Sequence, residues 1–317
     1  MNGGILVTDH VLAAAGAALH EAAGELPLVV LRPGAVDGDP AGVTVAYFSG
    51  DVYPERTREF VLTLARATAL HWLHSFAAGV DHPWFQQLLA RGVRVTNSSG
   101  ASAVPIAQTV MLYLLALSRD LRAWEDARRR KAWEPHDVVD LQGQTLAVLG
   151  MGPIGRSVAQ LGRSFGMDVI GMTRSPRGDE PCETWPLSRL DELLPRCDWL
   201  VIALPLAEET RGLLSGARLA RLRPGARLVN VGRGDVVDEP ALVEALRSGH
   251  LAGAGLDVFA TEPLPPESPL WEMPNVIVTP HSSGTSTANH SRATAIFLEN
   301  LARWRRGEPL RNEVKAG

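Results

Sequence analysis

Short apolar runs alternate with helical patterns along the first hundred residues. Residues 5–8, 28–31 and 43–48 have the length and apolar content of strands that lie buried in a parallel sheet. An alanine-rich helix is predicted at 11–23, between the first two of these strands. Further elements are expected as a helix near 55–65, a strand near 70–74, a helix near 83–90 and a strand at 93–95. This alternation predicts a parallel sheet covered by helices.

The second part of the chain repeats the alternation after one long apolar segment. Residues 105–121 are apolar around much of a helical circumference, so we expect a buried helix that connects two domains. The strands beyond it are predicted at 146–149, 169–172, 199–204, 227–231, 253–258 and 275–279, and a last helix near 294–304. Ligands of open α/β sheets bind at the carboxyl ends of the strands. The residues directly after these strands are therefore the candidates for function.

A glycine-rich turn joins the strand at 146–149 to a helical pattern. It consists of Gly150, Met151, Gly152, Pro153, Ile154 and Gly155, the spacing of a dinucleotide-binding fingerprint. Gly150 allows the tight turn, Gly152 lets a pyrophosphate approach the backbone, and Gly155 lets the helix pack closely on the strand. The N-terminus of the helix then suits an anion. Because a second strand follows in the right order, the segment predicts a dinucleotide site.

Composition and charge narrow the setting of this site. The 317 residues suffice for about two domains, and 45% hydrophobic with 21% charged residues is ordinary for a globular protein. A net charge of −4 and a pI near 6.2 give no reason to expect nucleic acid or an anionic membrane as a partner. The two cysteines have no metal-type spacing, so we expect no metal site and a reducing compartment. No secretion signal or membrane-spanning run is recognised, and a cytoplasmic protein is expected.

Three ionisable residues follow predicted strands of the second domain. Arg233 follows the strand at 227–231, Glu262 lies beyond the strand at 253–258, and His281 comes directly after 275–279. Each residue alone has an ordinary structural explanation. Because the carboxyl ends of neighbouring parallel strands meet at one edge of a sheet, we expect all three beside the dinucleotide.

The chain resembles the D-isomer-specific 2-hydroxyacid dehydrogenase family over essentially its whole length. The similar segments are the glycine fingerprint, 204–206 with Thr210, 230–234, 255–259 with Glu262 and Pro263, 279–281, the closing 312–314, and 76–82, which matches the family's substrate loop. The resemblance implies an NAD(P)-dependent oxidoreductase acting on the CH–OH group of 2-hydroxy acids. It also implies two doubly wound α/β domains, a Rossmann cofactor domain at 99–289 inserted in a flavodoxin-like substrate domain at 1–98 and 290–317. Closure of the two domains would then exclude water.

The same resemblance implies a role for each residue of the site. Arg233 would hold the carboxylate of a 2-oxo acid and polarise its C2 oxygen, which suits a planar and permanently charged guanidinium. His281 would donate a proton to the nascent alkoxide while the nicotinamide delivers hydride. Glu262 would fix the imidazole ring and favour its charged form. Backbone N–H groups of the loop with Ala78 and Gly79 would also bind the carboxylate.

The resemblance further implies contacts to the cofactor and an assembly. The implied cofactor contacts beyond the fingerprint are Leu204, Pro205, Thr210, Val231, Gly232, Asp257, Ser283 and Gly284. Members of the family are commonly homodimers through the cofactor domain and an arm near 124–133. The tryptophans of that arm are equally explained by packing in a core. The substrate stays open between glyoxylate, hydroxypyruvate and bulkier 2-oxo acids.

The end of the second fingerprint strand bears on the choice of nicotinamide cofactor. An NAD-preferring site has Asp or Glu there for the ribose 2′-OH. This chain has Thr173, Arg174 and Ser175 instead, and an arginine with a hydroxyl suits a 2′-phosphate. The sequence therefore favours NADP(H), with NAD(H) possible if Arg174 only stacks on adenine or faces solvent.

Two other functions fit parts of the sequence. A nucleotide-sensing co-regulator of the same fold is one alternative, because fold alone does not establish catalysis. A relative of formate dehydrogenase is the other, although such enzymes typically pair the histidine with Gln rather than with Glu262. The set of Arg233, Glu262 and His281 favours the 2-oxo acid reductase.

Overall fold

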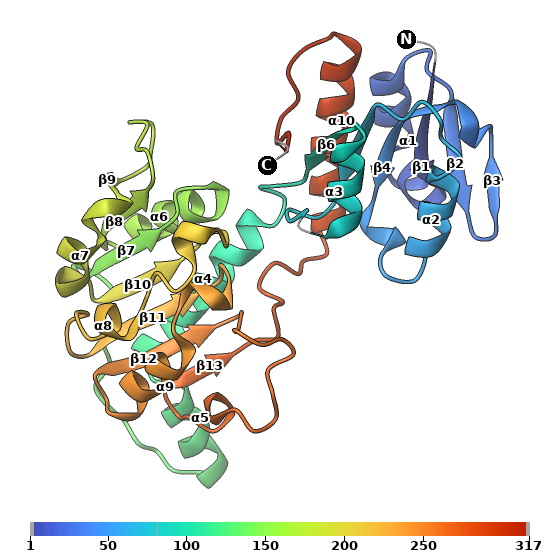
Figure 1. Ribbon diagram of the computed structural model, residues 1–317. Coiled ribbons are helices and arrows are strands. Elements are labelled where there is room, and N and C mark those ends of the chain that lie inside the picture. Colours follow the sequence, from blue (N-terminus) through green and yellow to red (C-terminus); the bar gives the residue numbers. More distant parts are fainter. Residues whose placement is uncertain (1–2, 81, 315–317) are drawn as a thin grey trace. The chain divides into compact units, whose positions relative to one another are not determined.

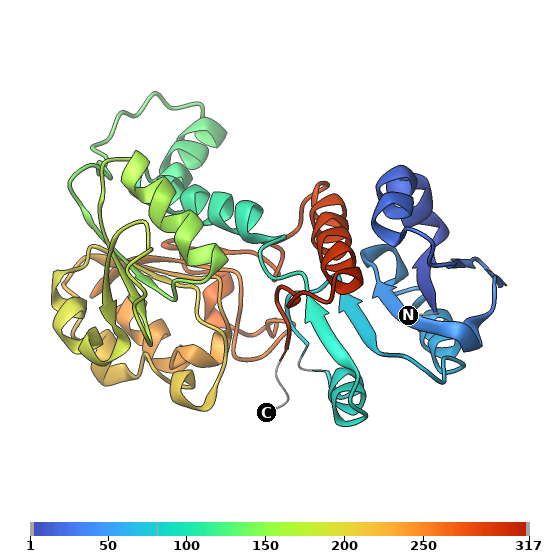
Figure 2. The same cartoon turned by 90° about the horizontal axis from the view of Figure 1, so that it is seen from above.

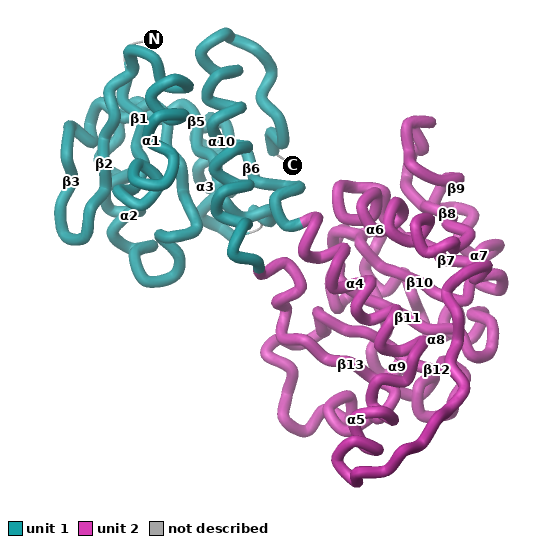
Figure 3. Tube along the Cα trace, turned by 180° about the vertical axis from the view of Figure 1, so that it is seen from behind, with its two compact units in different colours: residues 1–102, 286–317 teal, residues 103–285 magenta. Residues whose placement is uncertain are grey.

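The chain divides into two compact units. A computed structural model describes residues 3–80 and 82–314, so Asp81 of the predicted substrate loop lies outside the described residues. Unit 1 spans 1–102 and 286–317, and unit 2 spans 103–285 (Figure 3). The junctions differ by a few residues from those that the sequence suggests, at 98 and 289.

Unit 1 is built on a sheet of six strands within the described residues, in the order β3-β2-β1-β4-β5-β6 (Figure 1). Its strands are β1 (Gly4–Thr8), β2 (Leu28–Arg32), β3 (Ala35–Asp37), β4 (Val43–Phe48), β5 (Trp72–Ser75) and β6 (Arg94–Asn97). Its helices are α1 (Asp9–Ala23), α2 (Thr57–Leu64), α3 (Pro83–Ala90) and α10 (Asn289–Arg305). The elements predicted for this region are confirmed, and so is the parallel pairing of five of the strands.

The sixth strand of unit 1 was not predicted, and it runs antiparallel. Strand β3 pairs with β2 after a two-residue turn at Pro33 and Gly34, where Gly34 has a φ of +72°. A Pro-Gly pair between two short strands is a hairpin signal, so the sequence contained the information. The ion pair of Arg32 and Asp37 links the two strands.

Helices cover both faces of the unit 1 sheet. Ile5, Val7 and Val45 pack against α1 and α10 on one face, and Leu6, Ala46 and Leu73 pack against α2 and α3 on the other. Figure 2 shows α1 and α10 on the face opposite to α3.

Unit 2 has a fully parallel sheet, which has seven strands in the described part of the chain, in the order β13-β12-β11-β10-β7-β8-β9. The strands are β7 (Thr145–Leu149), β8 (Asp168–Thr173), β9 (Glu183–Pro186), β10 (Trp199–Ile202), β11 (Ala226–Asn230), β12 (Leu251–Leu256) and β13 (Val276–Val278). The helices are α4 (Ala103–Ser118), α5 (Leu121–Arg130), α6 (Pro153–Ser164), α7 (Leu190–Leu193), α8 (Gly216–Leu219) and α9 (Glu239–Arg247). Strand β9 was not predicted. The strand order reverses between β7 and β10, which places the expected ligand crevice at the end of β7.

Helices also cover both faces of the unit 2 sheet. Residues of α4 and α6 form one core with Leu146 and Val148, and α7, α8 and α9 form the other with Ala147 and Leu149. The helix α4 was predicted to be buried, and this is correct for one face only. Val104 and Leu112 on its other face are 45% and 55% exposed. None of the described helices has the length and apolar character needed to cross a membrane.

A buried histidine in unit 1 makes the stability of that unit sensitive to acid. Burial lowers the pKa of His74 to about 3, whereas the pKa of a histidine in the unfolded chain is about 6.5. Between these values the unfolded chain binds one more proton, so the free energy of unfolding should fall by about 1.4 kcal/mol per pH unit as the pH drops. A His74→Gln variant should lack this component below pH 6.

Hydrogen exchange of a peptide that contains β5, measured from pH 7 to pH 4, would report the free energy of opening of unit 1. The matched control is His20→Gln, whose side chain is exposed on α1. Parallel curves for wild type and His74→Gln would contradict the assignment.

Candidate active site

The glycine turn after β7 holds the start of α6 against the sheet. A Cβ on Gly155 would lie 1.8 Å from the carbonyl oxygen of Gly150, and one on Gly150 would lie 2.7 Å from that of Ala203. Both positions therefore exclude a side chain. Gly152 precedes Pro153 at the first turn of α6, and a Cβ there would meet nothing within 4 Å. Open space beside a helix N-terminus is what an approaching pyrophosphate requires.

A pocket of about 900 Å³ lies at this turn within unit 2. Its lining includes six of the predicted cofactor residues, namely Gly152, Pro153, Thr173, Arg174, Ser175 and Pro205. Arg156 and Arg177 also line it, and they are not among the predicted cofactor residues. Arg156 directly follows the last glycine of the fingerprint, and this position could have predicted that it lines the cofactor pocket. Asp179 and Glu180 line it as well, but Asp179 pairs with Arg156 and Glu180 accepts the N–H groups of Arg177 and Gly178. The three arginines therefore fit a dinucleotide whose adenosine end carries negative charge.

The arginine at the end of β8 is available to a ligand. The guanidinium of Arg174 is 3.2 Å from Glu209, but the two side chains are 85% and 56% exposed. An exposed pair of this kind contributes about 0 to 1 kcal/mol, so a phosphate can replace Glu209 at little cost. Arg156 instead pairs with Asp179 at 3.2 Å.

His281 and Glu262 form a pair at the ends of two neighbouring strands. The Nδ1 of His281 is 2.7 Å from Oε2 of Glu262, and both side chains are partly exposed. Since a carboxylate only accepts, Nδ1 carries a proton and Nε2 is the atom left for a substrate. Nε2 has no hydrogen-bond partner among the residues described. The other oxygen of Glu262 accepts the N–H of Phe259 at 3.0 Å, which orients the carboxylate.

Arg233 lies in the loop after β11, and this loop packs on the loop that follows β12. A Cβ on Gly234 would lie 1.9 Å from the carbonyl carbon of Phe259, so only glycine permits the contact. Asn230 braces the same loop, because its side chain donates to the carbonyl of Arg233 and accepts the N–H of Gly232, both at 3.0 Å. The loops that carry Arg233 and Glu262 are therefore in direct contact.

Asp257 directly follows β12 and is buried, with 1% of its surface exposed. Its carboxylate accepts the N–H groups of Ser282 and Ser283 at 2.8 and 3.0 Å, and the hydroxyl of Ser283 as well. Two of the residues predicted to contact the cofactor, Asp257 and Ser283, are thus bonded to each other. They hold the loop in which His281 has a φ of +49°.

The remaining predicted cofactor residues shape the loops after β10 and β11. The hydroxyl of Thr210 donates to the carbonyl of Pro205 and accepts the N–H of Ala207, both at 2.8 Å. Leu204 and Val231 are buried, and a Cβ on Gly232 would lie 2.6 Å from the carbonyl oxygen of Leu204. These loops border the carboxyl end of the sheet beside the fingerprint.

In unit 1, Ala78 and Gly79 form an exposed loop beyond β5. Asn97 donates to the carbonyl of Ala78 at 2.7 Å, and the N–H groups of Ala78 and Gly79 have no acceptor in the part of the chain that the structure describes. Free N–H groups on a fixed loop can bind a carboxylate. Leu73 and His74 of the preceding strand β5 belong to the core of unit 1.

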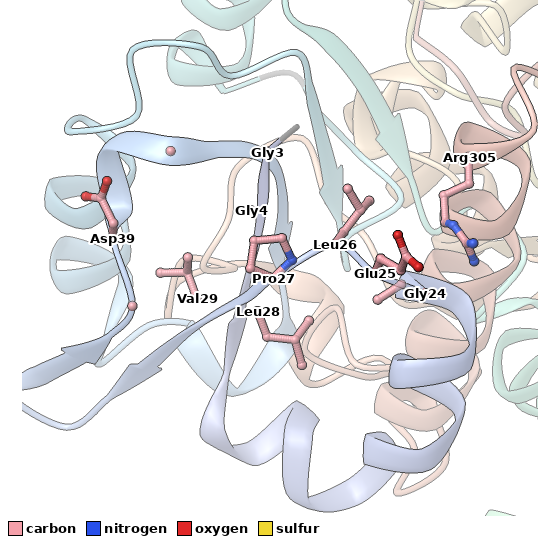
Figure 4. A pocket seen from close by; sticks show the side chains of 13 residues that line it. Gly3, Gly4, Gly24, Glu25, Leu26, Pro27, Leu28, Val29, Asp39 and Arg305 are labelled. Atoms are coloured by element: carbon pink, nitrogen blue, oxygen red, sulfur yellow. The ribbon is translucent and has the colours of Figure 1, made fainter. Parts of the chain in front are cut away.

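Unit 1 also has a pocket of about 800 Å³ at the amino ends of β1 and β2, with Arg305 and Glu25 on one side and Asp39 on the other (Figure 4). It lies at the opposite end of the sheet from Ala78 and Gly79. Arg305 is engaged there with the carbonyls of Glu21 and Ala22 at the end of α1. The described residues contain no group of three or more His, Cys, Asp or Glu side chains placed to hold a metal ion.

The chain is similar in sequence to known proteins. The profile of the D-isomer specific 2-hydroxyacid dehydrogenase NAD binding domain matches residues 111–283. The chain is 35% identical over 249 residues to a glyoxylate reductase of Korarchaeum cryptofilum, covering 76% of this chain and 75% of that protein. 

Solved structures resemble the chain over nearly its full length. A D-isomer specific 2-hydroxyacid dehydrogenase from Xanthobacter autotrophicus in complex with NADPH and MES has a TM-score of 0.78 and 34% identity, covering 99% of this chain and 98% of that chain. An NADPH-dependent glyoxylate/hydroxypyruvate reductase from Sinorhizobium meliloti in complex with NADP and sulfate has a TM-score of 0.77 and 31% identity, covering 100% and 99%.

Two glycine substitutions should separate folding from dinucleotide binding. In Gly152→Ala the new methyl group meets no protein atom but occupies the space expected for the pyrophosphate. We expect an unchanged melting temperature and NADPH affinity lowered at least about tenfold. In Gly155→Ala the methyl group collides with Gly150, so both quantities should fall. Thermal melting and fluorescence titration measure the two, and normal affinity in Gly152→Ala would contradict the placement.

Proposed function

The chain belongs to the D-isomer-specific 2-hydroxyacid dehydrogenase family, and we propose that it reduces small 2-oxo acids to 2-hydroxy acids with NADPH as the hydride donor. The observation that carries the proposal is the pair of His281 and Glu262 at 2.7 Å, on the sheet edge that also bears the glycine fingerprint. The glyoxylate reductase and the NADPH-bound dehydrogenase that resemble this chain support it.

The proton of the reaction comes from His281. Hydride addition to C2 of the 2-oxo acid turns the carbonyl oxygen into an alkoxide, which takes a proton from Nε2 of the imidazolium. Glu262 holds Nδ1–H, so the ring presents Nε2 to the substrate in both charge states. In the reverse direction neutral His281 accepts the hydroxyl proton at the same atom.

Arg233 holds the substrate carboxylate and polarises the C2 oxygen. Its guanidinium is half-buried and donates to the carbonyl of Gly232 at 2.8 Å, which leaves further N–H groups for a carboxylate. The planar fork of the guanidinium matches the two oxygens of a carboxylate. We also propose Ala78 and Gly79 as substrate contacts, because their N–H groups are donors without an acceptor among the described residues.

NADPH is preferred to NADH because of the charge at the end of β8. Arg174, Ser175 and Arg177 line the pocket where an NAD site would have an acid for the ribose hydroxyl. The complexes of two similar proteins with NADPH and NADP support this choice.

We further propose a homodimer in the cytosol. The helix α5 and the residues after it expose Leu121, Trp124 and Trp133, and Trp133 is 97% exposed. Exposed apolar side chains of this size mark contact surfaces, and a second copy offers the same patch.

The cysteines support the cytosolic location that we propose. Cys182 and Cys197 are both free thiols, as a reducing compartment requires.

The preference for NADPH should depend on Arg174. In Arg174→Ala we expect the Kd of NADPH to rise about 10- to 100-fold, since a charge-assisted bond to phosphate is lost. The Kd of NADH should change less than about threefold. Fluorescence titration with both nucleotides measures this, and Arg247→Ala is a matched control because Arg247 is also exposed and paired to a glutamate. Equal losses with both nucleotides would contradict the assignment.

Catalysis should depend on His281 far more than cofactor binding does. In His281→Ala we expect turnover to fall about 10²- to 10⁴-fold with the NADPH Kd unchanged within about threefold. NADPH oxidation is followed with glyoxylate, hydroxypyruvate, pyruvate and phenylpyruvate, and His20→Ala serves as the control. Inactivity of the wild type with every acid would overturn the proposed reaction.

A further inference from the structure

Hydrogen bonds to Asp257 hold the loop that carries His281. Thr279, two residues before the histidine, donates its hydroxyl proton to Oδ1 of Asp257 at 2.5 Å. Ser282 and Ser283 donate to the same carboxylate after it, and the N–H of His281 bonds the carbonyl of Asp257 at 2.9 Å. The backbone on both sides of His281 is therefore tied to one residue at the end of β12.

A second set of bonds reaches the same loop from α4. The single hydroxyl proton of Thr109 is shared between the carbonyls of Pro105 at 3.1 Å and Ser283 at 3.3 Å, and the hydroxyl of Tyr113 is 2.5 Å from that of Thr279. Residues four apart lie on one face of a helix. One face of α4 thus holds the loop at its start and at its end.

The bond between Tyr113 and Thr279 has a defined direction. The single hydroxyl proton of Thr279 is given to Asp257, so Thr279 accepts and Tyr113 donates. Burial raises the pKa of Tyr113 to about 12, which keeps the phenol protonated as a donor. The order of donation is Tyr113 to Thr279 to Asp257.

The ring of Tyr113 is seated against β12 where that strand has a glycine. A Cβ on Gly255 would lie 2.5 Å from Cγ of Tyr113, so any other residue there would displace the ring. Tyr113 has no exposed surface. The packing of the ring on Gly255 therefore holds the hydroxyl in place. Gly255 lies two residues before Asp257 in the chain.

We propose that Tyr113 is a positioning residue for proton transfer, which with Thr109 and Thr279 fixes the His281 loop to helix α4. The inference rests on the proposed role of His281 as proton donor. Tyr113 acts through the loop and touches neither substrate nor cofactor. A small displacement of a catalytic group lowers the rate of the chemical step far more than it lowers ligand binding. Loss of the Tyr113 hydroxyl should therefore slow proton and hydride transfer while the fingerprint pocket keeps its affinity for NADPH.

The test compares variants that remove one hydroxyl each. Tyr113→Phe removes the donor and leaves the ring beside Gly255, and Thr279→Val removes the middle hydroxyl at nearly constant volume. Thr279→Ser restores that hydroxyl. The matched control is Tyr47→Phe, because Tyr47 is also buried and bonded to a threonine, Thr294, but lies in unit 1. Single-turnover oxidation of NADPH by the best 2-oxo acid gives the rate of the chemical step.

We expect Tyr113→Phe to lower the single-turnover rate about 5- to 20-fold and Thr279→Val about 10- to 100-fold. The Kd of NADPH should stay within about twofold in both, Thr279→Ser should recover to within about threefold of wild type, and Tyr47→Phe should be unaffected. A wild-type rate in Tyr113→Phe would overturn the inference. Parallel loss of melting temperature, NADPH affinity and rate would also overturn it, because that pattern describes general destabilisation.

A second measurement does not depend on turnover. Hydrogen exchange of a peptide with residues 279–284 should be about fivefold to tenfold faster in Tyr113→Phe than in wild type, because one anchoring bond is lost. Unchanged exchange would overturn the inference even if the enzyme is active. If the wild type is inactive with every acid, the proposed reaction fails, and exchange alone decides whether Tyr113 anchors the loop.

Discussion

A buried carboxylate must find hydrogen-bond donors inside the protein, and at the carboxyl edge of unit 2 this requirement organises the site. Asp257 is 1% exposed, and its donors come from the loop of His281. Leaving a buried charge without such bonds would cost several kcal/mol, so the loop has one strongly preferred position. The unusual φ of +49° at His281 persists because the residues on both sides are tied down. The geometry that the proposed proton transfer needs is thus enforced by the desolvation of a neighbouring group.

The ion pairs of the site serve orientation rather than stability. The pair of His281 and Glu262 is partly exposed, and such pairs contribute about 0 to 1 kcal/mol to folding. The second hydrogen bond of Glu262, to the N–H of Phe259, costs no further ordering because Gly234 already packs on that residue. The pair of Arg174 and Glu209 is still more exposed and has no such support. A fixed acid-base pair and an adjustable arginine suit a proton transfer in one place and a phosphate contact in the other.

Local patterns in the sequence predicted most of the framework. Strand, glycine turn and helix around Gly150 are adjacent in the chain, so their geometry follows from spacing alone. Strand β9 was not predicted, since its residues 183–186 alternate poorly and end in proline. The Pro-Gly turn was the one sequence signal for the antiparallel strand β3. The strand was not predicted because the surrounding alternation is typical of a parallel sheet. The bond between Tyr113 and Thr279 could not be predicted, because 166 residues separate the partners and nothing in an apolar helix distinguishes a tyrosine that donates to a distant loop.

Each unit fastens the loop that carries its candidate residues by the same physical means. In unit 1 the hydroxyl of Ser98 donates to the carbonyl of Ser75, so it accepts from Nε2–H of His74, and Nδ1 of His74 is left to accept from Thr96. This buried chain supports the start of the loop that bears Ala78 and Gly79, as the chain from Tyr113 supports the loop of His281. In unit 1 the carbonyl of Ser75 only accepts, and in unit 2 the carboxylate of Asp257 only accepts. Each of these buried groups therefore fixes which hydroxyl of its chain donates and which accepts. A hydrogen-bond chain with one allowed direction has fewer alternative arrangements than an apolar contact, and it can therefore hold an exposed loop more rigidly than packing alone.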